Sequence, residues 1–112
     1  MSSLAALQGW GNGATAYAAS NGAIIAFTRG LSKEVADQGI TVNAVAPGLI
    51  LETPFHETFT DDAGIQAAID RTPLKRGGTP DDVANAIIYF ATDLGSFITG
   101  EILDINGGMY FA

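Results

Sequence analysis

Ile40-Thr-Val-Asn-Ala-Val-Ala46 is the stretch of sequence that decides the fold. It is rich in β-branched residues and is bounded by Gly39 and by Pro47-Gly48, a pattern typical of a short buried strand. A second run of this kind, Gly100-Glu-Ile-Leu-Asp-Ile-Asn106, lies near the end of the chain. Helical patterns separate the two runs, so the sequence predicts a parallel pair of strands with a right-handed crossover.

A long helix is predicted before the first strand, from residue 14 to residue 38, with Gly39 as its C-terminal stop. One apolar stripe of this helix is expected to face the core: Tyr17, Ile24, Leu31 and Val35. The opposite side carries small residues in place of polar ones: Ala19, Gly22, Ala26 and Gly30. A helix that is apolar or small on two sides is expected to be buried on two sides, so we expect a partner helix.

Between the strands, the sequence predicts a loop through Phe59 and then two helices. Thr60 and the acidic pair after it, residues 61–62, indicate an N-cap and first turn for a short helix to about residue 70. Thr79-Pro80-Asp81-Asp82 is a stronger start signal, for a helix that stops at Gly95. We interpret these carboxylates as helix-start charges and not as a metal site, and Arg76 as an anchor for the second helix.

Composition excludes several classes of function. The net charge of −7 disfavours nucleic acid and anionic membranes as partners, because both require clusters of Lys and Arg. The absence of cysteine excludes a disulfide scaffold and a thiolate metal site, and a single histidine leaves little for zinc chemistry. No apolar run reaches the roughly 18 residues of a membrane span, and the first residues lack the basic region of a signal peptide. We therefore expect a cytoplasmic protein with no metal.

The 112 residues allow one domain, and the predicted sheet is small for it. Parallel sheets are normally covered on both faces and seldom consist of two strands alone. A two-stranded sheet would also leave backbone groups unpaired along its edges. We therefore expect an α/β fold in which residues 1–112 form a single partial domain, a piece of a larger sheet.

A pair of serines and five motifs after it, in order along the chain, carry a resemblance to a known family. Ser2-Ser3 precedes a Gly-rich loop, and Tyr17-Ala-Ala-Ser-Asn21 places two polar side chains one helical turn apart. Further motifs follow along the chain: Asn43-Ala-Val-Ala-Pro47-Gly48, Pro73-Leu-Lys-Arg76-Gly-Gly, Ile98-Thr-Gly-Glu101 and Asn106-Gly-Gly-Met-Tyr110. Together they resemble the C-terminal half of the short-chain dehydrogenases/reductases, most of all the 3-oxoacyl-[acyl-carrier-protein] reductases. The resemblance implies a C-terminal fragment of a Rossmann-like, doubly wound fold.

The resemblance also implies a chemistry, the NAD(P)-dependent reduction of a 3-oxoacyl thioester to the 3-hydroxy form. In that family a tyrosine hydroxyl donates a proton to the substrate carbonyl, and a serine hydroxyl steadies the same oxygen. Tyr17 matches the tyrosine, and Ser3 (or Ser2) matches the serine. The segment that contacts the nicotinamide of NADP or NAD is matched by Pro47, Gly48, Ile50 and Thr53.

Asn21 departs from the family pattern, which has a lysine one turn after the tyrosine. A free phenol titrates near pH ~10, so proton transfer near neutrality requires a nearby positive charge. Asparagine can hydrogen-bond a ribose hydroxyl but supplies no charge. The spacing from Ser3 to Tyr17, and that from Pro47-Gly48 to Thr53, are each one residue longer than usual, a change that loops tolerate.

The family's nucleotide-binding half is also missing from the pattern. The glycines at 9, 11 and 13 are interpreted as a loop, because no strand precedes them and no Gly-rich helix start follows. Without a Gly-rich turn at a helix N-terminus, the sequence predicts no pyrophosphate site. We therefore expect a truncated or split reductase whose isolated chain lacks activity.

Each residue assignment has a plainer alternative. Tyr17 could be an ordinary core aromatic, Ser3 a flexible terminal serine, and Thr53 a turn residue before a proline. Asn21 is either a ribose ligand or an incidental replacement on a helix. His56 is interpreted as a solvated loop histidine.

Two further classes of function remain. The helix at 14–38 and the strand at 100–106 correspond to subunit interfaces in the family, so the chain could be a non-enzymatic module that forms homo-oligomers. It could also be the C-terminal half of a split reductase that a separate nucleotide-binding chain completes.

Overall fold

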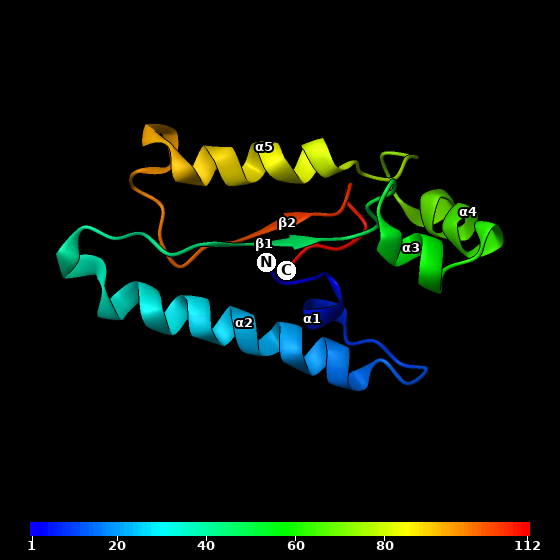
Figure 1. The fold of residues 1–112 in the computed structure, drawn as a ribbon, viewed down its shortest axis with the longest axis horizontal. Helices are drawn as coiled ribbons and strands as arrows, with labels where there is room; N and C mark the ends of the chain where they lie inside the picture. The colour runs from blue at the N-terminus through cyan, green and yellow to red at the C-terminus, as the bar shows by residue number, and fades with distance from the viewer.

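A short parallel sheet lies at the centre of the molecule, between two helical layers. The computed structural model describes residues 1–112, apart from the side chains of His56, Glu57 and Phe59. Strands β1 (Ala44–Pro47) and β2 (Ile102–Ile105) are parallel, with Val45 paired to Leu103. Helix α5 (Pro80–Ala91) lies on one side of the sheet and helix α2 (Thr15–Glu34) on the other (Figure 1). The predicted α/β fold with a parallel strand pair is confirmed.

Both strands begin later than predicted, because side chains of Thr99 and Asn43 take part in the hydrogen bonding before them. The backbone N–H of Val42 donates to Thr99 Oγ1 (3.0 Å). Asn43 Nδ2 donates to the carbonyl of Ile98 (2.9 Å), while its Oδ1 accepts from the N–H of Glu101 (3.0 Å). The N–H of Gly100 also donates to the carbonyl of Val42 (2.7 Å), so side chains and one backbone bond together hold the two segments before regular pairing starts at Ala44.

The first residues of the chain lie along the other edge of β1. The N–H of Ser2 donates to the carbonyl of Val45 (2.8 Å), and the N–H of Leu4 donates to that of Pro47 (2.9 Å). From the first bond to the second, both the donor and the acceptor move two residues toward the C-terminus, which is the pattern of parallel strands. The segment 2–4 therefore flanks β1 as β2 does, and it leads into α1 (Ala5–Gln8), a short helix that the sequence did not predict.

The predicted inward stripe of helix α2 is partly right, because Ile24, Leu31 and Val35 are half-buried and only Tyr17 is exposed. The most deeply buried side chains of α2 are polar. Its buried residues are Asn21, Thr28 and Ser32, whereas the Tyr17 side chain is 39% exposed. Ser32 Oγ donates to the carbonyl of Arg29 (3.0 Å) within the helix, which satisfies the buried hydroxyl. A small polar side chain such as that of Ser32 allows α2 to approach the segment that leads into β2. A Cβ atom at Gly100 would lie only 2.9 Å from Ser32 Oγ.

The long helical region ends in two steps. Helix α2 stops at Glu34 and a 3₁₀ turn, η1 (Ala36–Gln38), continues to Gly39. Gly39 has φ +73°, the left-handed conformation that the prediction of a glycine stop requires. The outer side of α2 remains exposed, and its Phe27 side chain is 65% accessible.

Helix α5 provides the other half of the core. Val83 packs with Val45 and Ile50, and the half-buried Phe90 and Leu103 join them. Thr79 and Asp82 form a capping box at its start, as the start signal predicted. The helix ends at Ala91 and a 3₁₀ turn, η2 (Asp93–Gly95), follows, so the predicted continuous helix to Gly95 is too long.

The connection from β1 to α5 contains two helices, α3 (Pro54–Phe59) and α4 (Asp62–Arg71). The predicted loop through Phe59 is therefore wrong in its second half. The N-cap of α4 is Asp61 and not Thr60, because the Asp61 carboxylate accepts from the N–H of Gly64 (2.8 Å). His56 lies in α3, but its side chain is outside the described residues.

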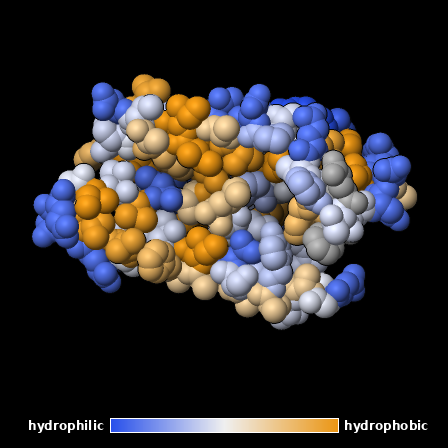
Figure 2. Space-filling model, in the orientation of Figure 1, coloured by the Kyte–Doolittle hydropathy of each residue, from blue (hydrophilic) through white to orange (hydrophobic). Residues whose placement is uncertain are grey.

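Apolar side chains remain on the surface. Figure 2 shows hydrophobic residues gathered on the side of the molecule where α5 lies. On that helix the Ile88 side chain is 58% exposed, and beyond it Phe97 is fully exposed. Within the described part of the chain, no helix is long and apolar enough to cross a membrane.

Candidate functional site

One cavity of about 900 Å³ brings together nearly all of the predicted site residues. It lies between the start of the chain, the end of β1 and the helices α3 to α5. The predicted residues that line it are Ser3, Tyr17, Pro47, Gly48, Ile50 and Thr53, with Ser2 beside them. Segments far apart in the sequence thus meet at the carboxyl end of β1, where ligands bind in open parallel sheets.

Tyr17 lies in the first turn of α2 at the edge of this cavity. Its ring stacks on that of Phe55 from α3, with ring centroids 6.0 Å apart and an interplanar angle of 29°. The sequence did not identify Phe55 as a site residue. Trp10, in the Gly-rich loop, also lines the cavity and was missed. Both are aromatic residues in segments that the sequence predicted as loops, and this was the signal that could have identified them.

The two serines are buried and occupy different positions. Ser2 Oγ donates to the carbonyl of Asn21 (2.9 Å), so its proton is engaged with α2. Ser3 Oγ accepts from the N–H of Ala5 (3.2 Å), which leaves its own proton available to a ligand. Ser3 is therefore the better placed of the two to polarise a carbonyl group, and burial argues against its alternative as a flexible terminal serine.

Asn21 is not among the residues that line the cavity. Its side chain is buried, and Nδ2 donates to the carbonyl of Tyr17 (2.9 Å), one turn earlier in the same helix. The amide therefore completes a contact within α2 at the position where the family pattern has a cation. Of the two readings of Asn21, this geometry favours the incidental replacement over the ribose ligand.

Gly48 allows the floor of the cavity to form. A Cβ atom at this position would lie 2.9 Å from Asn106 Cβ and 3.1 Å from Asn106 Cα. Next along the chain, the carbonyl of Ile50 accepts from Thr53 Oγ1 (3.2 Å). This bond turns the Thr53 hydroxyl toward its own backbone, which supports its alternative reading as a turn residue.

Backbone bonds tie the segment after Gly48 to the loop before α5. The N–H of Leu51 donates to the carbonyl of Gly78 (2.8 Å), and the N–H of Gly78 donates to the carbonyl of Leu49 (2.9 Å). A Cβ atom at Gly78 would lie 2.6 Å from Ile50 Cδ1, so the two segments approach closely. The segment that lines the candidate site is therefore bonded and closely packed against the loop before α5.

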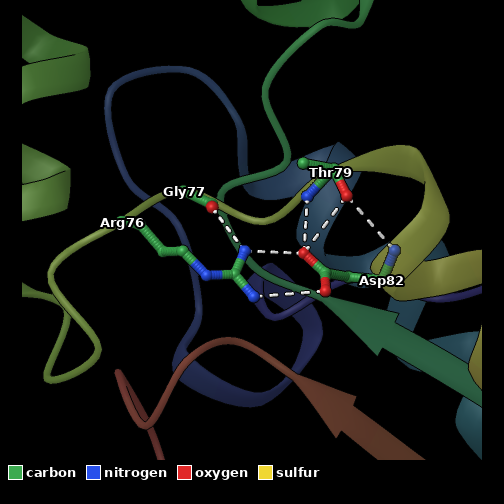
Figure 3. A network of polar contacts seen from close by, with 4 residues as sticks. All are labelled: Arg76, Gly77, Thr79 and Asp82. Atoms are coloured by element: carbon green, nitrogen blue, oxygen red, sulfur yellow. Dashed lines mark hydrogen bonds and ion pairs between the residues drawn. The ribbon is translucent and has the colours of Figure 1, made fainter.

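Arg76 and Asp82 form the ion pair that anchors this loop to α5 (Figure 3). Arg76 Nη1 lies 2.7 Å from Asp82 Oδ2, and it also donates to the carbonyl of Gly77. The guanidinium and the N–H of Thr79 hold the pKa of the Asp82 carboxyl well below its usual range. The interpretation of Arg76 as a helix anchor is confirmed.

Asp104 lines a second, smaller cavity of about 510 Å³ beside β2. Its Oδ1 atom is buried and has no hydrogen-bond partner among the described residues. Burial raises the pKa of this carboxyl above its ordinary value. Within the part of the chain that the structure describes, no group of three or more His, Cys, Asp or Glu side chains could hold a metal ion.

Comparison with known proteins agrees with this architecture. Residues 1–110 match the family model described as Enoyl-(Acyl carrier protein) reductase. The chain is 48% identical over 103 residues to the 3-oxoacyl-[acyl-carrier-protein] reductase FabG of Escherichia coli, which covers 89% of the chain and 41% of that protein. It is 45% identical over 101 residues to FabG of Thermotoga maritima, covering 89% of the chain and 40% of that protein.

Two solved structures from Brucella melitensis have the same fold over 99% of the chain. One is titled Short-chain dehydrogenase/reductase SDR:Glucose/ribitol dehydrogenase, with TM-score 0.91 and 39% identity, and the chain covers 44% of it. The other is titled 3-oxoacyl-[acyl-carrier protein] reductase, with TM-score 0.90, 36% identity and 41% coverage. The chain thus spans about two fifths of the length of these relatives. It belongs to the short-chain dehydrogenase/reductase family.

Proposed function

We propose that this chain supplies the tyrosine-bearing part of a site that reduces 3-oxoacyl thioesters to 3-hydroxyacyl thioesters, and that the isolated chain is inactive. The observation that carries the proposal is the shared cavity of Ser3, Tyr17 and the Pro47-Gly48 segment. The reductase names of the relatives support the same reaction class. A cytoplasmic location is part of the proposal.

The protein's own groups have separate tasks in this reaction. The Tyr17 hydroxyl donates a proton to the carbonyl oxygen of the substrate as that oxygen gains negative charge. The Ser3 hydroxyl donates a hydrogen bond to the same oxygen, which stabilises the developing charge. Phe55, stacked on Tyr17, limits the positions open to the phenol ring and excludes water from one of its faces.

The residues of the cavity suit the nicotinamide ring of a dinucleotide, whereas no predicted site residue suits the ribose next to that ring. Its volume is within the range of small-molecule sites, and Gly48 keeps the floor free of a side chain. NADPH or NADH bound there would supply the hydride. Asn21 does not fit as a ribose ligand, because its amide is bonded to the carbonyl of Tyr17.

The proposed inactivity depends on Asn21. An amide bonded within α2 provides no positive charge to stabilise the phenolate of Tyr17 during proton transfer. The proposal therefore predicts no oxidation of NADPH or NADH by the purified chain with acetoacetyl-coenzyme A, measured as loss of cofactor absorbance. Turnover at ordinary enzyme rates, abolished by Tyr17→Phe, would show that the chain is a working enzyme and that the inactivity is wrong.

A complementary chain offers the test of the active form. The chain spans about two fifths of the length of its relatives, so the test supplies the nucleotide-binding part as a second chain. The corresponding N-terminal part of the E. coli relative, mixed with this chain, is expected to restore slow reduction. Asn21→Lys should raise that rate and Tyr17→Phe should remove it. A mixture in which neither substitution changes the rate would contradict the assigned roles.

Self-association is the second candidate, and the exposed apolar side chains favour it. Phe27 on α2 and Ile88 on α5 are both more than half exposed, on opposite sides of the sheet. We propose a homo-oligomer formed through the helix at 14–38 and the strand at 100–106. Light scattering should give a mass above that of one chain, and Phe27→Asp should lower it. A monomer at high protein concentration would exclude this candidate.

A further inference from the structure

We propose that Arg71 recognises an anionic group of the ligand at the cavity that Tyr17 lines. The inference rests on the proposed function and adds a substrate class to it, a carbonyl compound that carries a phosphate or a carboxylate. Arg71 lies in the last turn of α4, and Tyr17 in the first turn of α2. Both line the same cavity of about 900 Å³.

The charge of Arg71 stands out against its surroundings. Among the described residues that line the cavity, it alone has a charged side chain, and most of the others are apolar or glycine. The chain carries 12 acidic residues against 5 basic ones, so carboxylates are plentiful elsewhere. A cationic side chain in a lining that has no carboxylate attracts a ligand of opposite charge with little competition.

Among the described residues, no side chain neutralises this guanidinium. Within the described part of the chain, Arg71 makes no ion pair or hydrogen bond through its side chain. The residues three and four positions before it are Ala68 and Ala67, so no acid faces it from the preceding turn. The adjacent carboxylate, Asp70, accepts a hydrogen bond from Gln66 Nε2 (2.9 Å).

The guanidinium is also suited to the proposed ligand. It presents a planar set of donors that matches the oxygen atoms of a phosphate or a carboxylate in a bidentate manner. Most of the other lining residues, among them Ile87 and Phe55, are apolar or glycine and suit an uncharged acyl segment. A ligand with its carbonyl group at Tyr17 and its anionic group at Arg71 would therefore contact both a polar and a charged side chain of this lining.

Trp10 supplies the readout for a binding test. It is the only tryptophan of the chain and lines the same cavity, so ligand binding should change its fluorescence. Two matched pairs of probes separate the sources of charge: pantetheine 4′-phosphate against pantetheine, and acetoacetate against methyl acetoacetate. Each pair differs in one anionic group, and neither requires hydride transfer.

The intact chain should bind at least one anionic probe about fivefold or more tightly than its neutral partner. Arg71→Gln should abolish that preference, and Arg71→Lys should retain part of it. The matched control is Lys33→Gln, which removes one positive charge from the exposed end of α2, outside the cavity, and should leave the preference unchanged. Circular dichroism of each variant checks that the fold is intact.

Three outcomes would overturn the inference: equal affinities within both probe pairs, an unchanged preference in Arg71→Gln, or an equal loss in Lys33→Gln. A preference for the phosphate probe alone would assign a phosphorylated carrier arm, and one for acetoacetate alone a small oxo acid. The proposed function fails separately, through the Tyr17 variants in the reduction assay, so the two failures can be told apart.

Discussion

Gly48→Ala tests whether the floor of the cavity is as closely packed as the structure shows. The added methyl group would lie 2.9 Å from Asn106 Cβ and 3.1 Å from Asn106 Cα. Neither atom is the flexible end of a side chain, so the backbone at Gly48 or at Asn106 has to move. Overpacking of this kind costs about 1–3 kcal/mol. For a domain of this size that corresponds to a fall in melting temperature of roughly 4–20 °C.

The matched control is the same substitution at Gly30. That residue lies within α2, away from both ends of the helix and on its exposed side, and a Cβ atom there would meet no other atom within 4 Å. Alanine is favoured over glycine in a helix by about 1 kcal/mol, so Gly30→Ala should raise the melting temperature. Thermal unfolding followed by circular dichroism measures both variants. If Gly48→Ala melts within a degree of the parent, or Gly30→Ala falls as far as Gly48→Ala, the packing argument is refuted.

Three other predictions concern the start of α5, the buried carboxylate of β2 and the aromatic stack. Thr79→Ala removes the side-chain acceptor of the capping box, so urea unfolding should show a loss of about 1 kcal/mol, and Thr79→Ser should recover most of it. Burial raises the pKa of the Asp104 carboxyl in the folded chain above the value of 3.8 that it has in the unfolded chain. The folded state therefore loses stability as the pH rises above 3.8 and the carboxyl ionises. Asp104→Asn should therefore raise the melting temperature at neutral pH and make no difference at pH values below 3.8, whereas an equal shift at both would contradict this. Phe55→Ala uncovers one face of the Tyr17 ring, so peptide mass spectrometry should find faster nitration of Tyr17 relative to the exposed Tyr89, and an unchanged ratio would argue against the stack.

Features that depend on residues close together in the sequence were predictable. The capping box of α5 involves Thr79 and Asp82, three residues apart, and the anchoring ion pair joins Arg76 to the same aspartate. Gly39 ends the long helical region because it adopts a positive φ there. In each case the interaction is formed by neighbours along the chain, so the order of residue types contained the information.

The polar part of the inward face of α2 could not be predicted from hydrophobicity. Asn21 and Ser32 are buried because each donates to a carbonyl of its own helix, which removes most of the cost of burying a polar group. The more apolar Tyr17 lies at the rim of the cavity, where it meets Phe55. That contact joins α2 to α3, and nothing in the local pattern of either helix indicated it.

The sequence by itself determined the family, the parallel strand pair and the candidate residues, because ordered motifs and local start and stop signals record them directly. Only the tertiary structure decided which of those residues share a cavity. It placed Ser3 in the cavity that Tyr17 lines by pairing residues 2–4 with β1, turned the Asn21 amide back onto its own helix, and brought Arg71 to the same cavity. These outcomes depend on contacts between segments many residues apart, and the physical reason is that packing and hydrogen-bond satisfaction across the whole sheet, not local propensity, select them.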